Sequence, residues 1–248
     1  MLIVRNCNDP GRVINEQFCT QSVSHSEQAS ALDKTIGRAS FHVATRPLFF
    51  LDKSLPVKWD MDFGWKGKLV RLVPLDVDRH LEDVYLWANN PELTRTLGFG
   101  ETPVSRGFER EFIERMSKPS ATDIVFAVET LEGRFVGLSG IHQIHQVDRT
   151  AVTGSYIGNP SDWGKGYGSE SALIRAWYCF NVLNLRMLKS VYYEGNEPSA
   201  RMNQKLGFVE YGRLPAAHYK RGEYHAEVLI YCTKEMWMAK TGGSLPSN

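Results

Sequence analysis

The chain has 248 residues, and its 29 basic and 28 acidic side chains leave a formal net charge of +1. Hydrophobic residues make up 42% of the sequence and aromatic residues 11%, which is enough to build a buried core. The charges are balanced and neither sign forms a long run, which argues against the basic surfaces that bind nucleic acid or anionic membranes.

The four cysteines are widely spaced, without a C-x-x-C pair or a histidine pair at metal-ligand spacing; they are Cys7, Cys19, Cys179 and Cys232. We therefore expect reduced thiols and no bound metal. No apolar run approaches the roughly 18 residues of a membrane span, and the sequence does not begin with a secretory signal layout. These features predict a soluble cytoplasmic protein with no membrane or nucleic-acid partner.

Three segments differ in composition. Residues 1–62 are polar and rich in Ser and Gln, without a sustained hydrophobic period, so we expect an irregular extension. Residues 63–239 carry clear helix and strand patterns and should form the functional domain. Residues 240–248, which contain two glycines and a proline, should form a flexible tail.

The patterned region predicts helices and strands in a mixed order. Strands are expected at 69–75 and 151–158, an antiparallel hairpin at 123–144 around the turn 131–133, and amphipathic helices at 76–90 and 105–116. Further along the chain we expect a helix at about 169–183, a strand at 186–193, a short helix at 196–208 and a closing strand at 225–234. This order predicts an α+β fold with a mixed, mostly antiparallel sheet.

Glycines at every second position precede the helix expected at 169–183. Gly164, Gly166 and Gly168 would let the backbone approach an anion at the start of that helix. The spacing does not match a P-loop, and a polar segment separates the glycines from the preceding strand, which weakens a dinucleotide fingerprint at Gly166, Gly168 and Ser171. A glycine-rich loop that only turns the chain is the remaining alternative.

Several ordered motifs resemble those of one enzyme family. "WANNPELTRTLGF", "GRFVGLSGIH", "WGKGYGSE", "GNEPSARMNQKLGF" and "KEMW" together resemble the GCN5-related N-acetyltransferase (GNAT) superfamily, in its subgroup of ribosomal-protein alanine N-acetyltransferases. The resemblance covers residues 65–237. It implies a GNAT-like sheet flanked by helices and an acetyl-CoA cosubstrate that gives its acetyl group directly to a primary amine.

The resemblance also suggests which residues hold acetyl-CoA. The amides of 165–169 would bind the pyrophosphate, with Lys165 adding a charge at the rim or remaining solvated. The expected contacts are Ile157, Trp163, Gly164, Lys165, Gly166, Tyr167, Gly168, Ser169, Asn196 and Asn203. Two of these depart from the family pattern, because Trp163 replaces a Gln or Arg and Asn203 replaces a Tyr that protonates the leaving thiolate. Asn196 could equally serve only as a helix cap.

No residue stands out as the catalyst. Ser199 is the candidate hydrogen-bond donor to the thiolate in place of the missing Tyr. The candidate bases are Glu227 and His142, and His145 is a further candidate. A chain without a strong base favours an amine of low pKa, so we expect α-amines or amino-sugar amines rather than polyamines or lysine side chains. A non-catalytic acyl-CoA-binding module and a nucleotide-dependent oxidoreductase remain alternatives. The loops at 98–107 and 213–226 should form the walls of the acceptor cleft.

Overall fold

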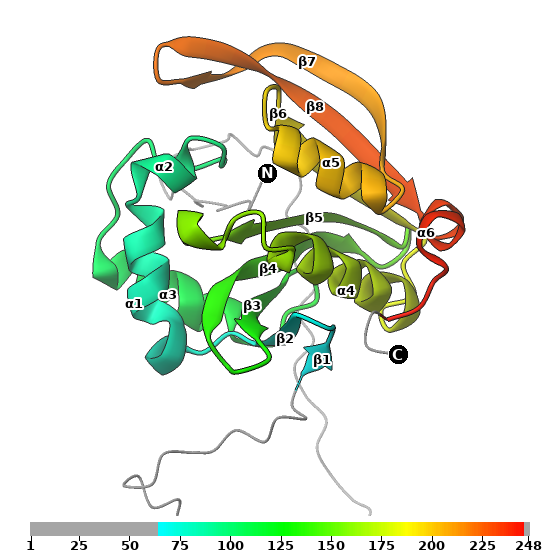
Figure 1. Cartoon of the computed structure of the whole chain (residues 1–248), viewed down its shortest axis with the longest axis horizontal. Coiled ribbons are helices and arrows are strands. Elements are labelled where there is room, and N and C mark those ends of the chain that lie inside the picture. The colour runs from blue at the N-terminus through cyan, green and yellow to red at the C-terminus, as the bar shows by residue number, and fades with distance from the viewer. Residues whose placement is uncertain (1–63, 246–248) are drawn as a thin grey trace, which may run out of the picture. The chain divides into compact units, whose positions relative to one another are not determined.

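The computed structural model describes residues 64–245 and builds them around one eight-stranded sheet (Figure 1). The predicted extension at 1–62 and the last three residues lie outside this range. The strands run in the order β1-β2-β3-β4-β5-β6-β8-β7. Their bounds are β1 Trp65–Lys66, β2 Val70–Pro74, β3 Ile124–Thr130, β4 Phe135–His145, β5 Thr150–Ile157, β6 Met187–Tyr193, β7 Val209–Lys220 and β8 Glu223–Thr233.

Every neighbouring pair in this sheet is antiparallel except β5 and β6, which run parallel. The fold class predicted from the sequence, α+β with a mostly antiparallel sheet and flanking helices, is therefore confirmed.

Six α-helices and one 3-10 turn accompany the sheet in the described range. They are α1 Val77–Ala88, α2 Pro91–Thr94, α3 Arg106–Met116, η1 Pro160–Asp162, α4 Tyr167–Asn181, α5 Glu197–Lys205 and α6 Lys234–Thr241. Side chains cap several of the helix N-termini, as the sequence predicts: Asp76 caps α1, Ser105 caps α3 and Asn196 caps α5. α6 continues past residue 239, the expected end of the domain, and Gly242 caps it at φ 76°.

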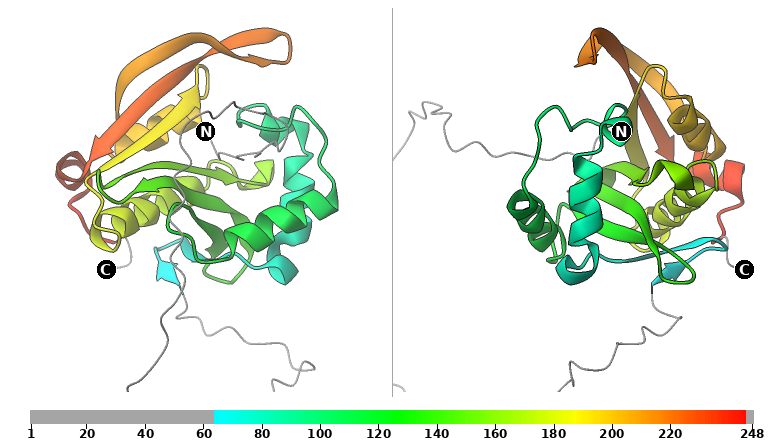
Figure 2. Two further views of the ribbon diagram at one scale, coloured as in Figure 1. Left: turned by 180° about the vertical axis from the view of Figure 1, so that it is seen from behind. Right: turned by 60° about the vertical axis from the view of Figure 1, so that its left-hand side comes forward.

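The helices cover the sheet from both sides (Figure 2). Leu81 of α1 and Ile113 of α3 pack with Leu138 of β4 in one hydrophobic cluster. Ile174 and Phe180 of α4 belong to a second cluster, which also holds β-strand residues and the end of α5. Because neighbouring strand residues point to opposite faces, the two clusters lie on opposite sides of the same strands.

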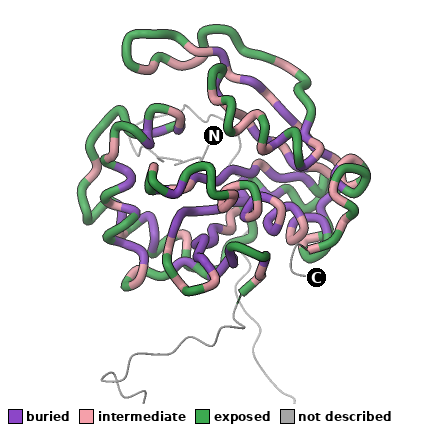
Figure 3. The backbone as a smooth tube through the Cα atoms, viewed as in Figure 1, coloured by how far each residue is buried: buried purple, intermediate pink, exposed green. Residues whose placement is uncertain are grey.

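One predicted loop is instead part of an antiparallel arm. Residues 213–226, expected as a loop wall, belong to β7 and β8, which are joined by a turn at Arg221 and Gly222 with φ of 52° and 94°. Two consecutive positive φ values are typical of a tight hairpin turn, but the sequence lacks the Asn-Gly or Asp-Gly pair that usually announces one. Most of β7 is exposed, as the tube in Figure 3 shows.

The parallel pair β5 and β6 separates partway along its length. Pairing runs from Thr150 with Met187 to Val152 with Lys189 and goes no further, although both strands continue. Beyond that point Ser190 Oγ donates to Thr153 O at 2.8 Å, and the buried Arg175 of α4 donates to Gly154 O at 2.9 Å. The Ser190 hydroxyl thus takes up a β5 carbonyl group where β6 turns away.

Candidate functional site

The glycine loop ends at the start of α4, close in the chain to the point where β5 ends. Gly164 and Gly166 have φ of 79° and 91°, a conformation that side-chain-bearing residues rarely adopt. The first intrahelical bond of α4 runs from Glu170 N to Gly166 O, so the amides of Tyr167, Gly168 and Ser169 need acceptors from outside the helix. The positive end of the helix dipole adds to this preference for an anion.

A buried carboxylate braces the loop from beneath. Asp162 is 3% exposed and accepts two hydrogen bonds from the Arg134 guanidinium, at 2.6 and 3.0 Å, and one from Lys165 Nζ at 2.9 Å. Hydrogen bonds from Arg134, and then from Lys165, hold the pKa of Asp162 below its ordinary value. Lys165 is therefore anchored at the loop, and two cations and one anion leave the cluster positive where an anion would bind.

The loop is also fastened to β5 and β2. Trp163 Nε1 donates to the carbonyl of Ile157, the last residue of β5, at 2.9 Å. The indole that departs from the family pattern thus holds the loop against the strand end. On the other side of the loop, the Glu170 carboxylate accepts the amides of Lys68, Leu69 and Val70, with distances of 2.6 to 2.9 Å. Glu170 has a structural role here.

Helix α5 brings together the three predicted residues on it. Asn196 Oδ1 accepts the amide of Ser199 at 3.2 Å and so caps the helix. Asn203 is buried, borders a groove between α5 and β7, and donates from Nδ2 to Ser199 O at 2.9 Å and to Ser199 Oγ at 3.3 Å. Because Ser199 Oγ acts as an acceptor toward Asn203, its own proton is directed elsewhere.

A cluster of ionisable side chains lies on the sheet face opposite α4. Glu227 of β8 is the cross-strand partner of Tyr193, the last residue of β6, and both point away from the core residues Ala226 and Val228. Burial raises the pKa of Tyr193 to about 12, and the nearby carboxylates Glu101 and Glu227 add to the shift. The Tyr193 hydroxyl therefore keeps its proton at neutral pH.

The hairpin arm contributes His218 to this cluster and closes over it. The His218 ring packs against Tyr193 with centroids 4.4 Å apart and the two planes tilted by 38°, and its Nε2 lies 3.6 Å from Glu227 Oε1. At the tip of the arm, Lys220 pairs with Glu101 and donates to Phe99 O at 3.4 Å.

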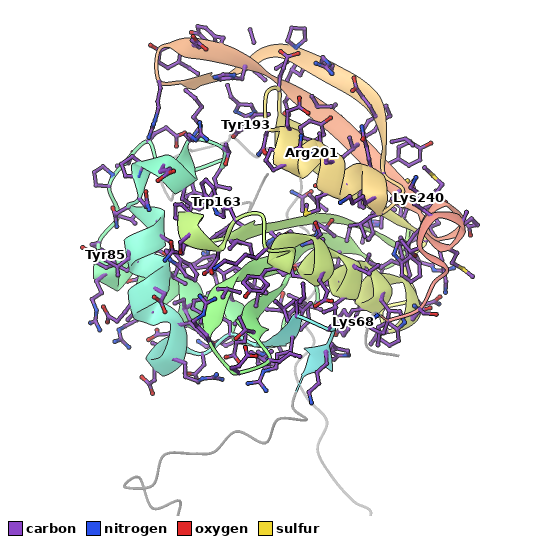
Figure 4. The ribbon with its side chains drawn as sticks, viewed as in Figure 1. Lys68, Tyr85, Trp163, Tyr193, Arg201 and Lys240 are labelled. Atoms are coloured by element: carbon purple, nitrogen blue, oxygen red, sulfur yellow. The ribbon has the colours of Figure 1, made fainter. Side chains whose placement is uncertain are left out.

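The arm therefore touches the segment that follows α2, and the two predicted acceptor walls meet. Figure 4 places Trp163 and Tyr193 at the same end of the sheet, where β5 and β6 both terminate.

His142 lies elsewhere on this face. It is buried and hydrogen-bonded to Asp123 at 2.9 Å, and burial lowers its pKa. Its cross-strand partner Val152 is level with Lys189, four residues before Tyr193, which is about 13 Å along a strand. The structure therefore does not bring His142 to Glu227, and His145 is solvent-exposed beside Asp148.

Several residues of the site were not singled out from the sequence. Arg134 and Asp162 meet only through the fold, although the Asp162 to Lys165 spacing is a local signal. His218, Tyr193 and Glu101 could have been proposed together only with the β7 register known. Cys179 and Cys232 are free and buried. Within residues 64–245, no helix could cross a membrane and no His, Cys, Asp and Glu group could hold a metal.

Comparisons with known proteins agree with this geometry. The family model described as "Acetyltransferase (GNAT) domain" matches residues 70–209. A Bacillus subtilis (strain 168) protein named "Putative ribosomal N-acetyltransferase YdaF" is 28% identical over 168 residues, 67% of this chain and 90% of that protein. The human alpha/beta-tubulin-N-acetyltransferase 9 is 28% identical over 58% of this chain and 74% of its own length.

Solved structures establish the same fold. A spermidine N-acetyltransferase from Vibrio cholerae, in complex with CoA and spermine, has a TM-score of 0.60 with 23% identity, covering 68% of this chain and 98% of that one. RimL, a ribosomal L7/L12 alpha-N-protein acetyltransferase in complex with coenzyme A, has a TM-score of 0.61 with 16% identity over 67% and 95% of the two chains. Since the family model spans more than half of the sequence, the chain belongs to the GNAT family and is an N-acetyltransferase.

Proposed function

We propose that the protein transfers the acetyl group of acetyl-CoA to a primary amine with a low pKa: a protein N-terminal α-amine, or the amine of an amino sugar or another small molecule. One observation carries this proposal. The glycine-flanked start of α4, whose first amides have no acceptor within the helix, follows the end of β5, and the last residues of β5 no longer pair with β6. A long molecule with a phosphate group at one end and a reactive group at the other fits such an arrangement.

The residues on the α4 side fit acetyl-CoA. The amides of 165–169 would hold the pyrophosphate, and Arg134 and Lys165, both anchored on Asp162, would add charge beside it. The pantetheine arm would follow β5 beyond Val152 toward α5. The hydrogen bond from Trp163 to Ile157 O holds the glycine loop to the end of β5. It would therefore fix the distance between the pyrophosphate and the pantetheine arm.

On α5, Ser199 would serve the leaving thiolate. The neutral amine nitrogen forms a bond to the acetyl carbon, the carbon–sulfur bond breaks, the sulfur leaves with the electron pair, and the proton that the nitrogen loses passes to Glu227. A thiol of pKa near ~8.5 leaves largely without protonation, so a hydrogen bond is sufficient help. Ser199 Oγ can supply that bond because Asn203 Nδ2 already donates to it. Asn203 then acts as a positioning residue in place of the family's Tyr.

On the opposite face, Glu227 would act as the base. It lies next to Tyr193 at the end of β6, and His218 of the hairpin arm lies beside it. An α-amine with a pKa of about 7.7 to 8.0 is roughly 300-fold more neutral at pH 7 than a lysine-like amine near ~10.4. A single partly exposed carboxylate suits the first amine class better than the second.

A two-step experiment tests the proposal. Thermal shift with acetyl-CoA should raise the melting temperature, whereas NAD should not. Thiol release should then be measured with peptides carrying a free N-terminus, an amino sugar, Nα-blocked lysine and spermidine. We expect the highest kcat/KM for one of the first two. A clear preference for spermidine would contradict the amine class, and binding of acetyl-CoA without release on any amine would contradict catalysis.

A further inference from the structure

Several titratable side chains of the β7–β8 arm share one face, and two of them, His218 and Glu227, lie close together at the acceptor side of the site. His218 Nε2 lies 3.6 Å from Glu227 Oε1, and the two side chains are 28% and 16% exposed. Within the described part of the chain, Nε2 is buried and makes no hydrogen bond. A buried ring nitrogen facing a carboxylate just beyond hydrogen-bond distance is a contact that can close when substrate binds.

An irregularity in β7 creates this arrangement. Leu214 pairs with Glu227 and His218 pairs with His225, so β7 advances four residues while β8 advances two. Ala216, inside this bulge, has a φ of 49°, which is unfavourable for a residue with a side chain. The bulge places His218 diagonally across from Glu227, on the same face of the hairpin. Backbone strain is thus retained at the position that brings the imidazole to the carboxylate.

Tyr193 fixes the orientation of the imidazole ring. The two rings are 4.4 Å apart with an interplanar angle of 38°, and Tyr193 is itself held at the end of β6 opposite Glu227. This packing keeps Nε2 directed toward Glu227 Oε1, so that a small shift is enough to close the 3.6 Å gap. An arm that served only to shape a cleft would not require a histidine on this strained segment.

We propose that His218 is a positioning residue for Glu227. Its Nε2–H donates to Glu227 Oε1 in the substrate complex, so that Oε2 faces the acceptor amine. This inference rests on the proposed function, in which Glu227 takes the proton that the neutral amine nitrogen loses as it attacks the thioester. His218 forms no bond to substrate and takes no proton in this scheme; it decides which carboxylate oxygen meets the amine, and at what angle.

Three substitutions separate hydrogen-bond donation from ring stacking. His218→Phe keeps the ring on Tyr193 but removes the donor, and should lower kcat for the amine by about 10- to 100-fold while KM for acetyl-CoA and the melting temperature stay near wild type. His218→Gln keeps an N–H at nearly the same place and should recover most of that loss. His225→Phe, directly across the same hairpin, is the matched control and should stay within about twofold of wild type.

The proposal also predicts how two changes combine. If His218 acts through Glu227, His218→Phe should cost almost nothing in a Glu227→Gln background. Multiplicative losses in that double variant, or a His218→Gln variant as impaired as His218→Phe, would overturn the proposal.

Nitrogen-15 NMR of the imidazole gives a readout without turnover. The His218 signals, assigned by their loss in His218→Gln, should show a protonated Nε2 that changes environment in Glu227→Gln. An unchanged His218 pattern refutes the contact. If wild-type protein releases no thiol with any amine, the proposed function fails by itself, and this measurement still decides on His218.

Discussion

The two sides of this site are constructed differently. On the α4 side, one short segment at 162–169 supplies most of the groups that would hold the pyrophosphate, and most of those groups are backbone amides. On the opposite face, Glu101, Tyr193 and the hairpin arm converge from distant parts of the chain, and their contribution comes from side chains. Binding of acetyl-CoA should therefore depend on the backbone conformation of the α4 side. Reaction with the amine should depend on which side chains are present on the opposite face.

The largest effect should come from the acceptor side. Glu227→Gln removes the candidate base while preserving shape, and should lower kcat/KM for the amine by about 10²- to 10⁴-fold. Acetyl-CoA should still raise the melting temperature of the variant, since Glu227 lies on the far face from α4. Steady-state thiol release and thermal shift measure the two quantities. A comparable loss of acetyl-CoA binding would show that the two sides are not separate.

The cofactor side should respond to backbone conformation. At Gly166 a Cβ atom would lie 3.1 Å from Leu69, and the φ of 91° is unfavourable for any side chain. Gly166→Val should raise KM for acetyl-CoA by about 10- to 100-fold, corresponding to strain of about 1–3 kcal/mol, with a smaller change in KM for the amine.

Gly168 provides the comparison within the same loop. It does not have a positive φ, and its added Cβ would meet Ile157 at an ordinary 3.5 Å. Gly168→Ala should therefore raise KM for acetyl-CoA far less than Gly166→Val. Equal effects of the two substitutions would mean that the loop needs space rather than a left-handed backbone.

The same contrast explains how much the sequence could predict. The loop and α4 depend on neighbours in the chain, so glycine spacing and helix periodicity located them, with the helix start at Tyr167 rather than Ser169 because Gly166 caps it. The arm depends on register with a distant strand. Pro215 is untypical of a strand interior, so the sequence around it predicts a loop, and only the register of β7 with β8 shows that His218 lies near Glu227.

A moderate effect is expected on α5, which packs in the same hydrophobic cluster as α4. Ser199→Ala removes the candidate donor to the thiolate and should lower kcat by about 10-fold, because water can replace part of one hydrogen bond. Arg201→Ala, on the exposed side of the same helix, is the control and should leave kcat near wild type. We expect kcat, measured with acetyl-CoA and with an acetyl donor whose thiol is a better leaving group, to show which step Ser199 assists. The loss of kcat caused by Ser199→Ala should be smaller with the second donor.

The ion pairs of Asp162 with Arg134 and Lys165 should affect how stability depends on pH. These pairs hold the pKa of Asp162 below that of an unfolded aspartate, which is near ~3.9. The contribution is therefore complete above that unfolded value and is lost as pH falls through the lower folded value. Asp162→Asn should lower the melting temperature at pH 7 by about 2–4 °C, and the difference from wild type should shrink below about pH 4. If the difference in melting temperature between wild type and Asp162→Asn were the same at every pH, the ion pairs would not be its cause.

The smallest effect should come from the tip of the arm. Glu101 is 57% exposed, whereas the Lys220 side chain that it pairs with is 9% exposed. An ion pair with one exposed partner contributes about 0–1 kcal/mol, so Glu101→Gln should barely change the melting temperature. It should nevertheless change KM for the amine by about two- to fivefold, because the pair joins the arm to the segment beyond α2 over the acceptor side. KM for acetyl-CoA should stay constant; if it changed by the same factor, the arm would serve both substrates.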